Sequence, residues 1–183
     1  MKSGIRIAAA ASGPIKGRES TLLVLVVYRE GLIEGVLSSR IGVDSFDSTD
    51  RIISRLKASR FFDQIKVIAL NGVALAGLNV VDVNRIKKLG KEYIIITRKK
   101  PHKELLIEAL ERSVKNKREA SRKAGIIEGV GKTQIRKLAG FYVQGSMKLS
   151  KGDTKLVSAS FEALRVAHII ANGVETGESK GRI

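Results

Sequence analysis

The sequence contains no cysteine and no tryptophan, and only two of its 183 residues are histidine. The absence of cysteine excludes disulfides, iron–sulfur clusters and zinc sites built from thiolates. Two histidines are too few for a histidine-rich metal centre, so any metal would be a hard cation held by oxygen atoms. Aromatic residues make up 4% of the chain, which argues against an aromatic platform for stacking nucleic-acid bases.

Long apolar runs are also missing from the sequence. No stretch approaches the length of a membrane span, and the first residues lack the apolar core of a secretory signal. We therefore predict a cytoplasmic protein without a membrane partner. The hydrophobic content of 43% and the length predict one globular domain over residues 1–183, in which residues 175–183 form a polar tail.

Positive charge is abundant. The chain has 34 lysines and arginines against 18 acidic residues, which gives a formal net charge of +16. Such an excess favours a polyanion such as DNA or RNA, bound mainly through its phosphates. A generally basic surface without any nucleic-acid ligand has the same composition, so this alternative stays open.

The hydrophobic pattern predicts an α/β fold with a mixed sheet. Strands are expected at residues 5–11, 21–28 and 32–43, and their short connections indicate antiparallel pairing. Buried strands at 67–70 and 92–97 alternate with helices, which is typical of parallel strands in a sheet covered by helices. Four helices are expected: one starts at Asp47 or Ser48, one covers about 80–89, one starts at Pro101, and one covers 160–172 and ends at Gly173. One further strand is expected at 141–149.

The stretch from residue 67 to residue 83 is central to the pattern. Four apolar residues are followed by Asn71 and Gly72. A polar residue at the carboxyl end of a central strand often contacts a ligand in α/β sheets. Asn71 also suits a simple polar turn after a buried strand.

Gly131-Lys132-Thr133 resembles the end of a phosphate-binding loop. The preceding glycine, Gly125, stands one position too early for that motif, and no buried strand leads into it. Residues 127–138 fit a helix–hairpin–helix better, in which a Gly-Val-Gly turn precedes a basic helix. Such a turn can present its backbone N–H groups to a phosphate. An ordinary glycine turn before a solvated helix is the alternative.

Several separated segments carry a family resemblance. They cover residues 6–14, 43–49, 71–82, 98–101, 164–168 and 177–182, so they span nearly the whole chain. Together they resemble the endonuclease dU family, which is related to endonuclease V. The resemblance implies a ribonuclease H-like fold and magnesium-dependent cutting of DNA or RNA next to a deaminated base. In such chemistry, carboxylates at strand ends hold Mg²⁺, which activates a water molecule.

The sequence departs from the family pattern where carboxylates are expected. The family has acidic residues at the end of the first strand, where Ala11 and Ser12 stand here, and an aspartate at the position of Asn71. An amide oxygen can contact Mg²⁺ but brings no negative charge. We therefore expect a weak or absent magnesium site.

The resemblance implies a set of candidate site residues. The catalytic candidates are Asp44, Asp47, Asn71 and His168, with Asp47 and Asn71 as metal ligands and Glu178 at the edge of the site. Asp47 suits a helix cap equally well, and a lone histidine on a helix face is often a packed core residue. The candidates for nucleic-acid contact are Arg98, Lys99, Lys100, Lys103, Lys132 and Arg182.

Three functional hypotheses follow. The first is a nucleic-acid-binding protein of the endonuclease dU family whose catalysis is weakened or lost. The second is a working Mg²⁺-dependent endonuclease that acts on deaminated DNA or RNA. The third is a structural or regulatory subunit that binds another protein or a second copy of itself, and this hypothesis predicts no salt-sensitive binding to nucleic acid.

Overall fold

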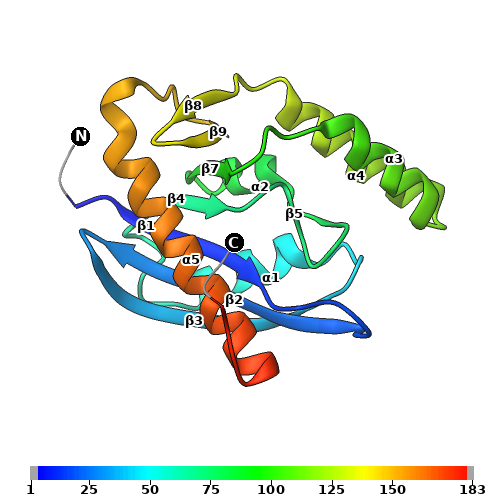
Figure 1. Cartoon of the computed structure of the whole chain (residues 1–183), viewed down its shortest axis with the longest axis horizontal. Coiled ribbons are helices and arrows are strands. Elements are labelled where there is room, and N and C mark those ends of the chain that lie inside the picture. The colour runs from blue at the N-terminus through cyan, green and yellow to red at the C-terminus, as the bar shows by residue number, and fades with distance from the viewer. Residues whose placement is uncertain (1–3, 181–183) are drawn as a thin grey trace.

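The computed structural model describes residues 4–180 and contains a seven-stranded mixed sheet covered by helices (Figure 1). The sheet strands are β1 (Arg6–Ser12), β2 (Ser20–Arg29), β3 (Leu32–Gly42), β4 (Ile65–Leu70), β7 (Glu92–Thr97), β8 (Arg136–Leu138) and β9 (Phe141–Gly145), and β5 (Ala74–Leu75) and β6 (Asn79–Val80) form a separate hairpin. The helices are α1 (Ser48–Lys57), α2 (Val83–Lys88), α3 (Lys103–Ser113), α4 (Lys117–Gly131) and α5 (Thr154–Thr176), and Lys151–Asp153 is a short 3-10 helix. The predicted mixed sheet with helices on its faces is confirmed.

The strand order is β3-β2-β1-β4-β7-β9-β8. Strand β1 is antiparallel to β2, and β2 is antiparallel to β3, so β1 and β3 run in the same direction. Strands β4 and β7 are parallel to β1. The carboxyl ends of β1, β3, β4 and β7 therefore meet at one side of the sheet, which we call the carboxyl edge.

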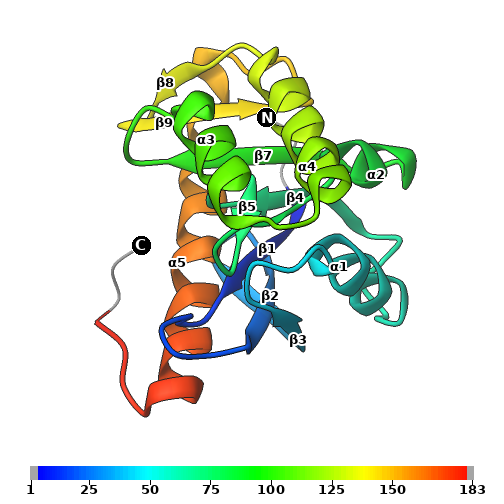
Figure 2. The same cartoon turned by 90° about the vertical axis from the view of Figure 1, so that its right-hand side faces the viewer.

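The core has one layer on each face of the sheet. Strand β1 contributes four consecutive buried alanines, which alternate between the two layers because successive side chains of a strand point to opposite faces. Ala9 and Ala11 pack with the small residues Ala167 and Ala171 of α5, so this helix lies close to the sheet. Figure 2 shows α5 along one face, with α1 and α2 on the opposite side.

Helix α5 is longer than predicted. It begins at Thr154, continues through the predicted stop at Gly173, and ends at Gly177, which has the left-handed conformation (φ +80°) of a helix C-terminus. Residues 175 and 176 of the predicted polar tail therefore belong to α5, while residues 181–183 lie outside the described residues. Within the described part of the chain, no helix is long and apolar enough to cross a membrane.

The predicted helix–hairpin–helix is wrong. The Gly-Val-Gly sequence forms the last turn of α4, because Ile127 and Val130 on this helix are buried in the core. The expected second helix is instead strand β8, which pairs with β9 and buries Leu138.

Two other predicted boundaries also shift. The helix expected over 80–89 begins only at Val83, because the side chain of Asp82 accepts hydrogen bonds from the amides of Asn84 and Arg85 and caps the helix there. The strand expected at 141–149 ends at Gly145.

Two glycines provide a matched test of the packing. A Cβ added at Gly145 would lie 2.4 Å from the carbonyl oxygen of Tyr93, while one at Gly125 in α4 would meet nothing within 4 Å. We expect Gly145→Ala to lower the free energy of unfolding by about 1–3 kcal/mol through this clash. Gly125→Ala should raise it by about 0.5–1 kcal/mol because alanine favours the helix. Urea denaturation measures both, and equal effects would contradict the strand pairing of β7 with β9.

A second test concerns the pH dependence of stability. Arg6 on β1 and Arg29 on β2 both donate hydrogen bonds to Glu34 on β3, and these bonds hold the pKa of Glu34 below its ordinary value of 4.5. The stabilisation is therefore present above pH 4.5 and disappears as the pH falls through the lowered pKa. We expect Glu34→Gln to destabilise the protein at neutral pH and to have little effect near pH 3. Glu30→Gln in the exposed β2–β3 turn is the control and should have little effect at either pH.

Candidate functional site

The carboxyl edge brings together residues that are far apart in the sequence. Ala10 of β1 lies opposite Leu70 of β4, and Leu70 lies opposite Ile95 of β7. Ser12, Asn71 and the basic residues after Thr97 therefore follow neighbouring parallel strands at this edge. Strand β3 ends at Gly42, so the loop that carries Asp44 and Asp47 starts from the same edge.

The three positions at which the resemblance implies carboxylates, Ala11, Ser12 and Asn71, carry other side chains in this structure. Ala11 is 4% exposed and packs against α5, so it belongs to the core. The hydroxyl of Ser12 accepts a hydrogen bond from the amide of Ala76 at 3.0 Å. Asn71 is exposed directly after β4. None of the three contributes a negative charge to the edge.

Asp47 is held in a buried hydrogen-bond network around Asn79. One carboxylate oxygen accepts from Nδ2 of Asn79 at 2.7 Å and from the amide of Gly42 at 3.2 Å. Asn79 is fully buried and also accepts from the amide of Ser48 at 3.0 Å. Asp47 occupies the N-cap position of α1, but its side chain makes no capping hydrogen bond. Its carboxylate therefore attaches the β3–α1 loop to the β5–β6 hairpin.

Asp44 is fixed to the same hairpin. Its carboxylate accepts from the amide of Leu78 at 2.8 Å, and its backbone has a positive φ of +54°. A Cβ at Gly77 would lie 2.2 Å from the carboxylate, so the close approach requires glycine at this position. The fully buried Lys123 of α4 donates to the carbonyl oxygen of Asp44 at 2.9 Å and forms an ion pair with Glu119 at 2.8 Å.

These contacts bear on a magnesium site. Asp44 and Asp47 each use a carboxylate oxygen to accept from protein N–H groups, and Ser12 and Asn71 carry no charge. Within residues 4–180, no group of three histidine or acidic residues is arranged to hold a metal ion. The side chains present do not fit a magnesium ion held by several carboxylates. The assignment of Asp47 and Asn71 as metal ligands stays a prediction.

His168 lies on α5 in a separate cavity of about 260 Å³, which Asn172 and Glu178 also line. Nδ2 of Asn172 lies 3.2 Å from Nε2 of His168. The end of this helix is held at the carboxyl edge because Glu175 forms ion pairs with Arg18 and Arg40. The structure thus brings His168 and Glu178 into one cavity, and Arg182 lies outside the described residues.

The predicted basic residues Arg98, Lys99, Lys100 and Lys103 are all exposed immediately after β7, and we call residues 98–103 the basic segment. The guanidinium of Arg98 lies over the ring of Phe161, 5.3 Å from its centre, and Phe161 stacks on Phe141. The predicted contact residue Lys132 is exposed at the end of α4. The carboxyl edge therefore carries a concentrated positive charge next to β7.

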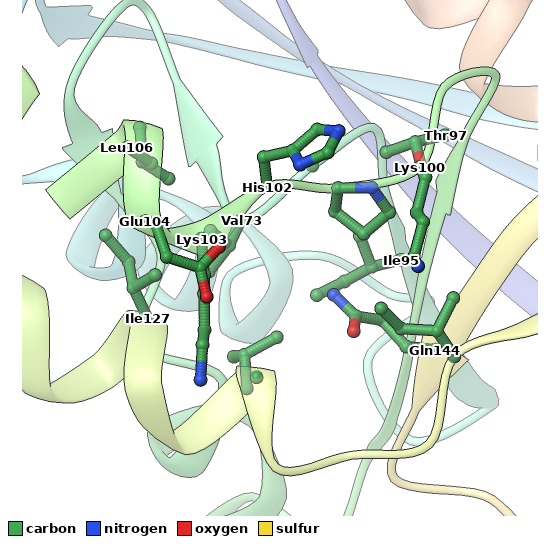
Figure 3. A pocket seen from close by; sticks show the side chains of 15 residues that line it. Val73, Ile95, Thr97, Lys100, His102, Lys103, Glu104, Leu106, Ile127 and Gln144 are labelled. Carbon is green, nitrogen blue, oxygen red and sulfur yellow. The ribbon is translucent and has the colours of Figure 1, made fainter. Parts of the chain in front are cut away.

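A cavity of about 460 Å³ opens beside the basic segment, between β7 and the α3–α4 pair (Figure 3). Its size is within the range of about 300–1,000 Å³ that is common for small-molecule sites. The apolar side chains that line it are Val73, Ile95, Leu106, Ile127, Val130 and Ile135. The polar and charged ones are Thr97, Lys100, His102, Lys103, Glu104 and Gln144.

Gln144 was missed by the sequence analysis. It lies opposite Ile95 in the β7–β9 pair and is 7% exposed. Within the described residues, its buried Oε1 atom has no hydrogen-bond partner. Leaving a buried acceptor unpaired costs about 1–3 kcal/mol. The one available signal in the sequence was a polar residue after apolar neighbours in Tyr142-Val143-Gln144. This pattern alone does not show that Gln144 is buried, because its burial depends on the pairing of β9 with β7.

Comparison with known proteins places the chain in a family. Residues 3–175 match the family Endonuclease dU. The chain belongs to this family. It is 36% identical to the UPF0215 protein of Pyrococcus furiosus, over 98% of this chain and 96% of that protein. It is 35% identical to the UPF0215 protein of Methanothermobacter thermautotrophicus, over 99% of this chain and 93% of that one.

Solved structures agree with the family. A crystal structure of a protein of unknown function from Archaeoglobus fulgidus has a TM-score of 0.80 and 28% identity, and the match covers 93% of this chain and 98% of that one. Human ENDOV has a TM-score of 0.51 at 10% identity, with 91% and 82% of the two chains covered. The predicted ribonuclease H-like fold is confirmed. This member of the endonuclease dU family is an endonuclease-like protein related in fold to endonuclease V.

The role of Asp47 in this family member can be tested through stability. Asp47→Ala removes one of the two acceptors of Nδ2 of Asn79 and the side-chain acceptor of the Gly42 amide, and we expect it to lower the free energy of unfolding by about 1–3 kcal/mol. Asp47→Asn keeps an accepting oxygen and loses only the exposed pair with Arg51, at 3.7 Å, which contributes less than about 1 kcal/mol. Asn79→Ala removes the side chain at the centre of the network and should lower the free energy of unfolding by about 2–4 kcal/mol.

Urea denaturation of the three variants measures these differences. If Asp47→Ala is as stable as Asp47→Asn, the carboxylate does not hold the loop, and Asp47 is free for another role. The comparison also matters for activity assays, because a loss of function in Asp47→Ala alone does not separate chemistry from folding.

Proposed function

We propose that this member of the endonuclease dU family binds DNA or RNA at its carboxyl edge and that its metal-dependent cleavage is weakened or lost. The observation that carries the proposal is the basic segment, which places four exposed cationic side chains directly after the parallel strand β7. The phosphate backbone is the chemical partner that such a cluster suits best.

The arrangement of the cations supports a strand that passes along the edge. Arg98 lies on the side of the sheet covered by α5, where Phe161 holds its guanidinium in place. Lys100 and Lys103 line the cavity on the other side of β7. A strand that contacts all of them crosses the end of β7, and its phosphates need no aromatic platform. The small aromatic content of the chain is consistent with this mode of binding.

The proposal that cleavage is weakened rests on the side-chain atoms that could bind a metal at the carboxyl edge. A phosphodiester cut by Mg²⁺ needs negative ligands that hold the ion next to the phosphate. Ala11, Ser12 and Asn71 supply none, and the carboxylates of Asp44 and Asp47 accept hydrogen bonds that hold two loops together. Metal binding at Asp47 would compete with the network around Asn79.

Binding can be tested with two double variants of equal charge. Lys99→Gln with Lys100→Gln removes two cations from the basic segment, and Lys57→Gln with Lys66→Gln removes two exposed cations elsewhere. We expect the first pair to weaken binding to a labelled single strand at least about tenfold and to reduce the slope of log affinity against log salt by about 1.4. The control pair should leave the slope nearly unchanged. Equal losses in both would mean that the contact is not localised at the edge.

Cleavage can be tested on strands that contain one uracil or hypoxanthine, with Mg²⁺ or Mn²⁺. We expect no nicking above background by the natural chain and measurable nicking after Ser12→Asp with Asn71→Asp, because these positions are accessible and follow neighbouring strands. Ala11→Asp is left for a separate triple variant, since Ala11 is 4% exposed and a carboxylate there would be buried. Nicking by the natural chain that Asp47→Asn abolishes would instead support the working endonuclease. The absence of any salt-sensitive binding would favour a subunit that binds protein.

A further inference from the structure

Strand β3 lies at one end of the sheet and exposes apolar side chains. It pairs with β2 on one side, and no other described segment pairs with its outer side (Figure 1). Leu32, Ile33 and Val36 on this strand are 69%, 50% and 46% exposed, and they are three of the six exposed large apolar side chains among the described residues. Apolar side chains beside unpaired backbone N–H and C=O groups favour pairing with a further strand.

Most of the features that keep edge strands apart are missing from this part of the chain. Lysine and proline, the residues that most often protect such an edge, are absent from residues 17–56. An extra residue at Glu34 shifts the register against β2, so the strand is irregular only near its start, and residues 35–42 pair regularly. Arg40 is the one charged residue in this regular part, and Glu175 of α5 pairs with it at 2.9 Å.

The charge of this region restricts the partner. The whole chain carries +16, so two copies repel each other over most of their surface. Residues 17–56 differ, because they contain five arginines and six acidic residues, which gives a formal charge of −1. Two copies therefore meet at this region without net repulsion, whereas a nucleic acid gains no attraction from it.

The sequence of the strand is also self-complementary. An antiparallel pair of identical strands is related by a two-fold axis, so each strand offers the other the same residues in reverse order. With this axis at Leu37, Val36 of one copy faces Ser38 of the other, and Gly35 faces Ser39. Each larger side chain then meets a smaller one, and no charged residue of the regular part faces a like charge.

We propose that β3 pairs antiparallel with β3 of a second copy about Leu37, so that the two sheets continue into one. The pairing satisfies backbone groups on the outer side of both strands and covers Val36. Strands β2, β1 and β4 separate β3 from β7, so the basic segment lies away from this contact. The inference therefore does not depend on the proposed binding of nucleic acid.

The mass in solution tests the contact, measured by light scattering over a range of protein concentrations. We expect the natural chain to have twice the mass of one chain, with a dissociation constant at or below about 10 μM, as for a small interface. Val36→Lys places two ammonium groups as diagonal neighbours across the axis and should weaken the dimer at least about tenfold. Leu105→Lys, at a 63% exposed position on α3, is the control and should leave the mass unchanged.

The absence of cysteine from the natural chain permits a second, geometric measurement. Leu37→Cys places two identical thiols opposite each other at the axis, where the Cα atoms of an antiparallel pair lie about 4.5–5.5 Å apart, within the range of a disulfide. Under mild oxidation we expect a covalent dimer from Leu37→Cys and a monomer from the exposed control Leu105→Cys on denaturing gels.

Each result decides the proposal. A natural chain that stays monomeric at about 100 μM would overturn it, and the edge would then be open to a different protein. A dimer that Val36→Lys does not weaken would also overturn it, because the contact would lie elsewhere. Failure of Leu37→Cys to cross-link more than Leu105→Cys would exclude pairing about Leu37. Far-ultraviolet circular dichroism confirms that each variant is folded, so that loss of the dimer in Val36→Lys with cross-linking by Leu37→Cys supports the proposal.

Discussion

The buried carboxamide of Asn79 is the contact on which the carboxyl edge depends. It donates to the carbonyl of Gly42 at 2.8 Å and to Asp47, and it accepts from the amide of Ser48. One side chain thus joins the end of β3, the start of α1 and the β5–β6 hairpin. Because Asn79 and Ser48 are fully buried, their polar groups would otherwise lack a partner, so the three segments keep one arrangement. Asp47 is a member of this arrangement rather than a free carboxylate.

Lys123 likewise uses buried polar contacts to fix helix α4, which forms one wall of the cavity. Its ammonium group is fully buried, yet it donates to the carbonyl of Asp44, pairs with Glu119 and lies 5.5 Å from the ring centre of Phe46. A buried charge is tolerated only with such partners. The contact fixes α4 against the loop after β3, and α4 forms one wall of the cavity beside the basic segment. The shape of the cavity therefore depends on the same loop that Asn79 holds.

Local pattern was sufficient for most strands and insufficient for the site. Strands β1, β2, β3 and β7 were predicted within about one residue because continuous or alternating apolar residues mark them directly. The turn expected at Gly129-Val130-Gly131 failed because burial of Ile127 and Val130 keeps the helix intact through two glycines. The role of Asp47 depends on Asn79, which is 32 residues away, and no local pattern contains that contact.

The electrostatics of the edge give these contacts a functional meaning. An edge built from several carboxylates is negative and needs a cation before a phosphate can approach it. Here Ser12 and Asn71 are neutral, Asp44 and Asp47 are hydrogen-bonded to loop N–H groups, and lysines and an arginine follow β7. Under the proposed function, a phosphate at this edge meets the positive charge of the basic segment directly. Under the same proposal, this distribution of charge favours holding a strand at the carboxyl edge over cutting it.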